Sequence, residues 1–385
     1  QRLWRVMIIL IISAGYLRML QESLRPNIKK GAMKKMKYDS FRPGKEWKDT
    51  NGKPIQAHGG SVIYIDGIFY WYGENKEKTK PDNDIWHWGV RCYSSVDLYN
   101  WKDEGIIIKP VTDDPESPLY PSKCMDRPHI LYNKKTLKYV CWLKIMEKDG
   151  TQDMTVLTAD HILGPYTMVK KGYRPYDMSS GDFDLAVDDQ SGKAYYFFEK
   201  VHSELICAEL DETYTGVGEI YSEHFKNGQP PYVREAPAYF ERNGKKYLIT
   251  SGTTGYHPNP SEAAMAEEWH GPWKVLGDPH RNDRSMTSFN SQISCIFKHP
   301  EKEDLYIAMA DRWLPNLPET EGDGFYTGEA YRKVEQSFKE EFSGIADKKE
   351  KDEETDYGKD DTSIARYVWL PIRFEGDVPY IEWQN

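Results

Sequence analysis

Residues 234–256 read REAPAYFERNGKKYLITSGTTGY, and this stretch contains the pattern from which the fold is predicted. An aromatic strand follows Glu235, and a second apolar strand follows the dipeptide Asn243-Gly244. Because Asn-Gly tolerates the positive φ angles of a tight hairpin turn, the stretch predicts two antiparallel strands. Glu235 stands directly before the first strand among apolar residues, where poor solvation raises the pKa of a carboxyl group.

The same strand–turn–strand pattern recurs along the chain. Each unit pairs a short apolar strand with a polar turn and a longer aromatic strand, and a further strand signal follows each unit. The units span residues 61–74, 128–144, 183–200, 237–252 and 294–313. Several strands repeated at intervals of about 50 residues are typical of propeller blades. We therefore predict an all-β protein with a five-bladed β-propeller; the alternative is a β-sandwich with hairpins at loosely regular intervals.

The composition narrows the functional classes. Aromatic residues make up 14% of the 385 residues, a density that suits strands and surfaces that stack on sugar rings. A formal net charge of −10 without a basic stripe argues against a nucleic-acid partner. The five cysteines lack CxxC spacing and are expected to be free, buried thiols. The sequence contains neither a GxGxxG motif nor a phosphate-binding loop, and we expect no cofactor and no metal.

Residues 1–47 are expected to precede the propeller, which we place at residues 48–385 as a monomer. Arg2 and Arg5 come before the apolar run 6–12, a pattern that resembles a secretory signal and is too short to span a bilayer. The alternative is that residues 1–35 are disordered or not native. A signal favours an extracellular or periplasmic protein, whereas free cysteines favour the cytoplasm, so the sequence leaves the compartment open.

A charged insertion interrupts the last unit at about residues 316–363. Its first part, YRKVEQSFKEEF (331–342), has the apolar spacing of a helix. Its second part, DKKEKDEETDYGKDD (347–361), has little apolar content and is predicted to be solvated or mobile. We expect a surface excursion without a role in the site, and the alternative is a flap at the rim of the propeller.

A polar residue stands just ahead of the first strand in four of the five units. These residues are Asp126, Asp182, Glu235 and Gln292. Since the inner strands of propeller blades run along the central axis, we predict that these side chains converge at one mouth. The first unit differs, because its entrance reads QAHGG (56–60) and lacks a carboxylate. Glu74 ends the second strand of that unit and is expected to reach the same mouth.

Acidic groups around an aromatic mouth suit glycoside cleavage, which needs a proton donor for the leaving oxygen. We assign the donor to Glu235, because neighbouring carboxylates raise its pKa by like-charge repulsion. Asp182 is expected to orient Glu235 and to tune its pKa. The alternative for Asp182 is calcium or turn chemistry together with Asp184, Asp188 and Asp189.

For other residues near the predicted mouth, the sequence allows two alternative roles each. His58 is either a ligand for an ion or water on the axis or a packed structural histidine. Arg127 is a substrate hydrogen-bond donor or a counter-charge for the acidic cluster. Four tryptophans are candidates for sugar stacking, although for each one taken alone a place in the core is the favoured interpretation: Trp71, Trp86, Trp88 and Trp313.

The quoted segments resemble glycoside hydrolase family 43, whose fold is a five-bladed β-propeller. The resemblance covers roughly residues 48–375 and is carried by QAHGG (56–60), DRPHILYN (126–133), SGDFD (180–184), REAPAYF (234–240), FNSQ (289–292) and ADRW (310–313). Within the family, the chain looks most like the exo-β-1,3-galactanase branch, in which blade one lacks the usual Asp base. The resemblance implies inverting release of terminal galactose from a β-1,3-galactan, with an oligo- or polysaccharide as the partner.

The resemblance also implies roles for individual residues. Glu235 matches the general acid, Asp182 the carboxylate that modulates the acid, and Gln292 the glutamine proposed to stand where the base would act. The substrate-binding positions of the family are matched by Glu74, Asp126, Arg127, Thr253 and Gly255.

Two departures from the branch fall around the sugar pocket and bear on specificity. Asp126 stands where the branch usually has Glu, and Gly181 stands where an Arg usually precedes the blade-three Asp. Two alternative functions remain. One is a related hydrolase acting on arabinofuranosides, galactofuranosides or xylosides, and the other is a non-catalytic carbohydrate-binding propeller.

Overall fold

The computed structural model describes residues 37–317, 328–343 and 360–384. Regular structure in these residues is mostly β-strand, arranged as five four-stranded antiparallel sheets. The strands are β1 (His58–Ile65), β2 (Ile68–Glu74), β3 (Val90–Ser95) and β4 (Lys102–Ile108); β5 (Cys124–Asn133), β6 (Lys138–Met146), β7 (Gln152–Ala159) and β8 (Thr167–Tyr173); β9 (Ser180–Val187), β10 (Ala194–Lys200), β11 (Glu204–Leu210) and β12 (Val217–His224); β13 (Arg234–Arg242), β14 (Lys245–Gly252), β15 (Glu262–Ala266) and β16 (Lys274–Gly277); and β17 (Gln292–Lys298), β18 (Tyr306–Arg312), β19 (Arg366–Glu375) and β20 (Val378–Ile381).

Within the described residues, the helical elements are the α-helix α2 (Gly328–Ser343) and the short 3-10 helices η1 (Pro175–Asp177) and η4 (Thr362–Ile364). Helix α2 confirms the helix predicted for residues 331–342. No helix in the described part of the chain is long and apolar enough to cross a membrane. The signal-like segment 1–35 and most of the acidic segment 347–361 lie outside the described residues.

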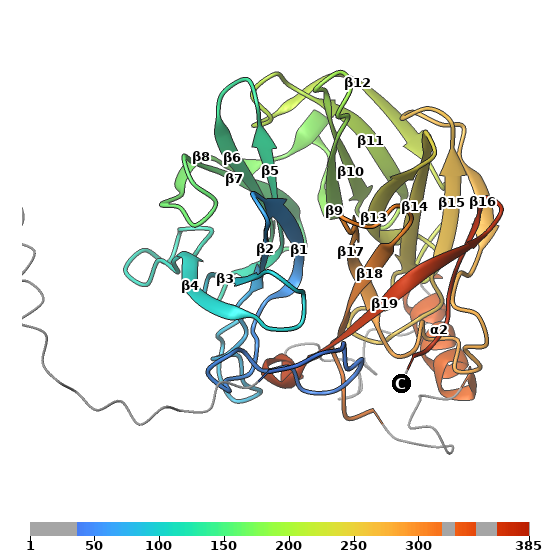
Figure 1. The fold of residues 1–385 in the computed structure, drawn as a ribbon. Helices are drawn as coiled ribbons and strands as arrows, with labels where there is room; N and C mark the ends of the chain where they lie inside the picture. The colour runs from blue at the N-terminus through green and yellow to red at the C-terminus, as the bar shows by residue number, and fades with distance from the viewer. Residues whose placement is uncertain (1–36, 318–327, 344–359, 385) are drawn as a thin grey trace, which may run out of the picture. The chain divides into compact units, whose positions relative to one another are not determined.

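The five sheets form a five-bladed β-propeller, which confirms the predicted fold class (Figure 1). The four strands of each blade follow chain order, and the first strands of the blades contact one another in a closed ring, in the order β1, β5, β9, β13, β17 and back to β1. The Asn243-Gly244 turn joins β13 to β14 with positive φ at both residues, as predicted.

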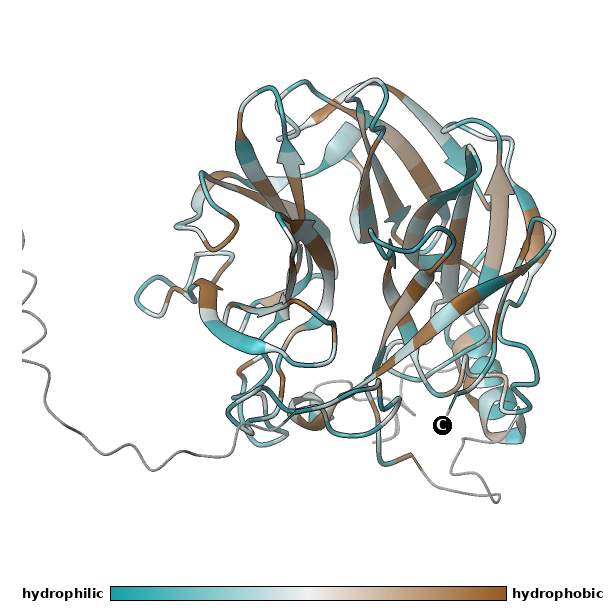
Figure 2. Ribbon diagram, in the orientation of Figure 1, coloured by the Kyte–Doolittle hydropathy of each residue, from teal (hydrophilic) through white to brown (hydrophobic). Residues whose placement is uncertain are grey.

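The hydrophobic core lies between the blades. Five clusters of buried apolar side chains occur, and each joins two neighbouring sheets. Because neighbouring blades cover both faces of the middle strands, these strands carry continuous apolar runs instead of alternating ones; β10 is buried from Ala194 to Glu199. Figure 2 shows this pattern, with hydrophobic colour concentrated on the strands and hydrophilic colour on the loops. All five cysteines are free as predicted, and all but Cys124 are buried.

The ring closes between blade five and blade one through side chains, since each of these blades is built from consecutive strands. Trp71 packs against Trp369 with ring centroids 4.7 Å apart, and Trp47 adds a further ring to this cluster. Trp47 is buried, so the folded domain includes residues before the boundary predicted at 48. At the axis, Asp311 Oδ1 lies 2.9 Å from His58 Nδ1, and its Oδ2 accepts a 3.0 Å hydrogen bond from the Gly59 N–H.

Asp311→Ala tests this closure. The substitution leaves a buried imidazole and a buried N–H without their acceptor, and we expect the free energy of unfolding to fall by about 3 kcal/mol. Urea denaturation measures the change. Glu212→Ala is the matched control, because it removes a carboxylate from an exposed ion pair with Lys135 and is expected to have no measurable effect. An equal effect of both substitutions would contradict a role for Asp311 in closing the ring.

Candidate functional site

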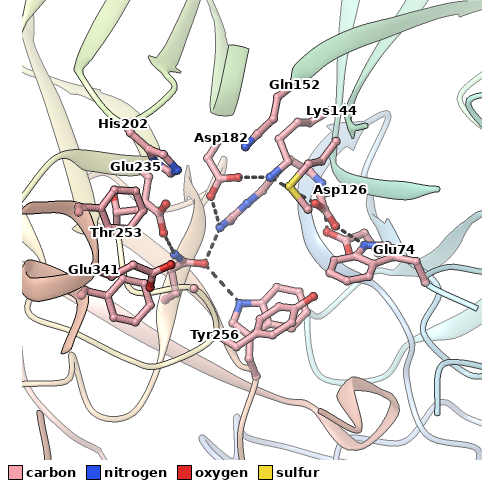
Figure 3. Close-up of a pocket in the computed structure, with 18 residues that line it drawn as sticks. Glu74, Asp126, Lys144, Gln152, Asp182, His202, Glu235, Thr253, Tyr256 and Glu341 are labelled. Carbon is pink, nitrogen blue, oxygen red and sulfur yellow. Dashed lines mark hydrogen bonds and ion pairs between the residues drawn. The ribbon is translucent and has the colours of Figure 1, made fainter. Parts of the chain in front are cut away.

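One pocket with a volume of about 270 Å³ collects all the predicted site residues. It lies where the inner strands begin, and its lining includes Glu74, Asp126, Arg127, Asp182, Glu235, Thr253, Gly255 and Gln292. Figure 3 shows Glu235 and Thr253 on one side, Glu74 and Asp126 on the other, and Asp182 between them. The predicted convergence of strand entrances on one mouth is therefore confirmed.

A one-residue bulge at the start of each inner strand aims these side chains. In blade four, pairing with β14 is interrupted between Glu235 and Ala238, and Ala236 takes a φ of 46° inside the bulge. In blade two the same interruption follows Asp126, and Arg127 has a φ of 54°. A bulge bends the strand and redirects the side chains beside it. Glu235 and Asp126 are therefore turned off the regular strand toward the mouth.

Asp182 differs from this register. Regular pairing in blade three resumes at Phe183, so Asp182 lies inside the bulge, whereas Glu235 and Asp126 lie just before theirs. The four predicted polar residues share one mouth but are not strictly equivalent along their strands. Asp182 is placed farther along its strand, where it meets the side chains of Arg127 and Lys144 from blade two.

Arg127 connects the blades at the centre of the pocket. Its guanidinium donates to Asp182 Oδ2 at 2.7 Å and to Gln292 Oε1 at 2.5 Å. Its backbone N–H donates to Glu74 Oε1 at 3.1 Å. Gln292 in turn donates from Nε2 to Glu235 Oε1 at 3.2 Å. Arg127 therefore contacts blades one, three and five directly and reaches blade four through Gln292.

Two carboxylates are held ionised by buried cations. Lys144 Nζ lies 2.8 Å from Asp182 Oδ1 and 3.2 Å from Asp126 Oδ2. Although burial opposes the shift, Arg127 and Lys144 hold the pKa of Asp182 well below its usual range. Burial is likewise outweighed at Asp126, where Lys144 and Lys76 lower the pKa of the carboxyl group.

Glu235 has the opposite electrostatic environment. Burial raises its pKa well above the usual range, and the charges of Asp182 and Glu199 raise it further, while Arg127 acts weakly in the other direction. The described contacts of its carboxyl group include the neutral amide of Gln292 and no cation within ion-pair distance. The site thus places a carboxyl group with a raised pKa beside one with a lowered pKa, a pairing that suits acid catalysis near neutral pH.

Glu74 is the second carboxyl group with a raised pKa. Burial raises the pKa of Glu74 to about 7, with Lys76 Nζ opposing the shift from 3.0 Å and Asp126 reinforcing it. Lys76 is fully buried and also donates to the Trp86 carbonyl at 3.0 Å. The side of the pocket formed by Glu74 therefore has buried polar groups that are held in place by hydrogen bonds and ion pairs. Sites that select a ligand by its hydroxyl groups have such fixed polar groups.

Aromatic side chains form one wall of the pocket. The rings of Trp86 and Tyr256 stack with centroids 6.0 Å apart, and Tyr256 lies 5.3 Å from Trp313. Trp86 and Trp313 were both predicted as stacking candidates, and both line the pocket. Trp71 has the core place that was favoured for each tryptophan taken alone, since it is fully buried and its Nε1–H donates to the Ala57 carbonyl. Trp88 packs under Lys78 and lies outside the pocket lining.

His58 is a structural histidine by its contacts. Its Nδ1 meets Asp311, and its ring stacks on Tyr367 with Nε2 at 3.3 Å from the phenol oxygen. Asp188 has the turn role considered for it, since its carboxylate accepts from the Gln190 N–H at 2.9 Å. In the described ranges, no cluster of three or more His, Cys, Asp or Glu residues is arranged to hold a metal ion.

Polar residues near the ends of the second strands pair with the residues at the entrances of the first strands: Glu74 with His58, Lys144 with Asp126, Ser251 with Glu235 and Asp311 with Gln292. Of these, the sequence analysis identified Glu74 as a site residue and missed Lys144, Ser251 and Asp311. The signal was present, because each of these aromatic or apolar strands carries a polar residue near its end. Reading the hairpins as paired strands would have identified Lys144.

Gly181 stands at the position where the resemblance leads one to expect Arg, and the space beside it is occupied by the side chain of another residue. A Cβ atom on Gly181 would lie 2.2 Å from Glu199 Oε2, so the Glu199 carboxylate occupies the space that a side chain there needs. Glu199 is buried, and its charge raises the pKa of Glu235. The Glu199 carboxyl group therefore fills the space beside Gly181.

The fold and the pocket together combine a five-bladed propeller with carboxyl groups of divergent pKa beside an aromatic wall, an arrangement that suits a carbohydrate ligand. The family model for glycosyl hydrolases family 43 matches residues 52–312. The chain belongs to glycoside hydrolase family 43.

Solved structures support this membership. A family 43 β-1,3-galactosidase is 29% identical with a TM-score of 0.70, over 90% of this chain and 63% of that one. A second, solved with galactodeoxynojirimycin, is 28% identical with a TM-score of 0.69, over 89% of this chain and 99% of that one. An exo-β-1,3-galactanase from Clostridium thermocellum is 26% identical with a TM-score of 0.66, over 89% and 64%. The chain thus spans less than two thirds of the first and third of these proteins. No curated protein matches the sequence.

The raised pKa of Glu74 predicts a specific pH dependence of stability. Since the folded protein keeps the proton up to about pH 7 and the unfolded chain releases it near pH 4.5, the free energy of unfolding falls between these values, by about 3 kcal/mol. Glu74→Gln removes this contribution. Urea denaturation at several pH values should show wild type losing stability relative to Glu74→Gln as the pH rises through this window. A constant difference between the two proteins would contradict the assignment.

Proposed function

We propose that the protein is an exo-acting glycosidase that releases terminal galactose from β-1,3-linked galactan chains with inversion. The observation that carries the proposal is the raised pKa of Glu235 beside the lowered pKa of Asp182 in one pocket. The galactose specificity is supported by similarity to structures described as β-1,3-galactosidases and exo-β-1,3-galactanases.

In this mechanism Glu235 acts as the general acid. It donates its proton to the glycosidic oxygen as the bond to the anomeric carbon breaks, and the departing sugar leaves as a neutral alcohol. Asp182 stays ionised, keeps the pKa of Glu235 high before the transfer, and stabilises positive charge that develops at the sugar ring. Water attacks the anomeric carbon from the opposite face, inverts its configuration and passes its excess proton to solvent, from which Glu235 is reprotonated.

We assign substrate binding to residues on the side of the pocket opposite Glu235 and to residues of the loop after β14. Asp126 and the protonated Glu74 are placed to hydrogen-bond sugar hydroxyls, and Arg127 holds both sides in register. The loop residues Thr253 and Gly255 line the pocket beside Glu235. The Thr253 N–H donates to the Pro231 carbonyl at 3.0 Å, so its place is fixed by the fold.

Gln292 is the residue to which we assign the positioning of water. Its amide is fully engaged in the described contacts: Oε1 accepts from Arg127 and Trp313, and Nε2 donates to Glu235 and Ser251. An inverting site keeps acid and base about 6.5–9.5 Å apart to admit water, and the 3.2 Å contact between Gln292 and Glu235 is shorter. The assignment therefore requires that a bound sugar separates this pair.

Product analysis tests the proposal. We expect NMR of wild-type protein acting on β-1,3-galactan oligomers to detect α-galactose first, released one unit at a time from the non-reducing end. Glu235→Gln is expected to lower kcat by about 10³-fold or more, because a neutral amide cannot donate the proton. Release of β-galactose first, or of arabinose or xylose from the corresponding aryl glycosides in preference to galactose, would overturn the proposal. Wild-type protein that binds oligomers without cleaving them would favour the non-catalytic alternative.

Asp182→Asn tests the tuning of the acid. A general acid loses activity as the pH rises through its pKa, and removing the negative charge of Asp182 lowers the pKa of Glu235. The alkaline limb of the kcat/KM profile is therefore expected to move to lower pH, by about one unit. Asp126→Asn is the matched control, since it removes the other Lys144-paired carboxylate and should leave the limb in place. A limb that stays fixed in Asp182→Asn would rule out the tuning role.

A further inference from the structure

Helix α2 forms part of the pocket, so the expectation of a surface excursion away from the site is wrong. The family match ends at Arg312, and α2 follows it in the chain. Three of its residues, Phe338, Glu341 and Phe342, line the same pocket as Glu235. The helix adds to the site a wall that the matched family region does not supply.

The sequence of α2 explains how it is held. Tyr331, Val334, Phe338 and Phe342 recur at helical spacing and form an apolar stripe along one face. Tyr331 and Phe338 are buried, and the rings of Phe338 and Phe342 are nearly parallel with centroids 6.5 Å apart. The buried Tyr331 side chain holds the start of the helix against the propeller. The last two rings of the stripe, Phe338 and Phe342, line the pocket.

His202 meets this stripe from the propeller side. It occupies the turn between β10 and β11 with a φ of 58°, and its ring lies edge-on to Phe342 with centroids 5.0 Å apart. The buried Glu199 carboxylate fixes this turn, since its Oε1 accepts from the His202 N–H at 2.8 Å and lies 3.4 Å from Nδ1. The imidazole is thus positioned by the rigid blade and not by the helix.

The position of these groups relative to Glu235 indicates what they contact. Figure 3 shows His202 and Glu341 on the Glu235 side of the pocket, opposite Glu74 and Asp126. A general acid protonates the oxygen that joins the sugar bound in the pocket to the departing sugar, so the departing sugar lies beside the acid. An aromatic ring next to the acid is therefore placed to meet that sugar.

We propose that α2 and His202 form the leaving-group subsite, an inference that rests on the proposed function. The departing pyranose stacks its apolar C–H face on Phe342, with Phe338 behind it. Glu341 and His202 hydrogen-bond the hydroxyls of this sugar. The subsite selects substrates whose leaving group is itself a sugar, and it leaves the recognition of the terminal galactose to the propeller.

Paired substrates test this subsite. β-1,3-Galactobiose fills both subsites, whereas β-galactosyl fluoride carries a leaving group of one atom and needs only the galactose site. We expect Phe342→Ala to lower kcat/KM for galactobiose by about tenfold and to leave kcat/KM for the fluoride within about twofold of wild type. His202→Ala probes the same subsite from the propeller and should show the same selectivity. Lys339→Ala, on the exposed part of α2, is the control and should change neither value.

The outcomes are distinguishable. A selective loss with galactobiose in Phe342→Ala and His202→Ala supports the subsite. An equal loss with both substrates, or no loss with either, overturns the subsite while the proposed function stands; the fluoride rate itself shows that each variant is folded. Failure of wild type to hydrolyse either galactoside overturns the proposed function, and the subsite with it.

Discussion

The pocket depends on the Arg127 guanidinium. It is buried at the meeting point of the blades, where it bonds Asp182 and Gln292, while its backbone bonds Glu74. A buried guanidinium is costly unless it is paired and hydrogen-bonded, and side chains of blades three and five accept hydrogen bonds from it. The same contacts fix the distances between groups that lie far apart in the sequence. The left-handed backbone at Arg127, inside the bulge, is what turns this side chain toward the axis.

One consequence is an uneven distribution of protons. Arg127 and Lys144 surround Asp182 and keep its pKa low, whereas Glu235 faces neutral and negative groups and keeps a raised pKa. Like-charge repulsion from the ionised Asp182 then increases the separation. Glu199, which fills the space beside Gly181, acts in the same direction. The proposed chemistry thus depends on the buried cations Arg127 and Lys144 bonding to Asp182 and not to Glu235.

The hairpin repeat was sufficient to predict the propeller, because strand length, aromatic content and turn type are local properties of the sequence. It was also sufficient to bring Asp126, Asp182, Glu235 and Gln292 to one mouth. What it did not reveal depends on pairing between strands and on contacts between blades. Lys144 is identified as a site residue only when its strand is paired with that of Asp126, and the bulge that offsets Asp182 has no separate sequence signal.

Helix α2 illustrates the same limit. Its apolar spacing predicted a helix, but nothing local to residues 331–342 indicates that the far end of its stripe reaches a pocket to which all five blades contribute. Trp71 shows the converse, since it lies in an aromatic strand that ends at the mouth with Glu74, yet its ring packs in the core between blades one and five. Secondary structure was predictable at both places, whereas the direction of the side chain was not.

The central claim is that Glu235 holds a proton at neutral pH while Asp182 does not. Neutron diffraction from crystals exchanged into deuterated buffer at pH 7 observes this directly. The account predicts a deuterium atom on the Glu235 carboxyl group and none on Asp182, whose oxygens accept from Arg127 and Lys144. A bare Glu235 carboxylate, or a deuteron on Asp182, would contradict it.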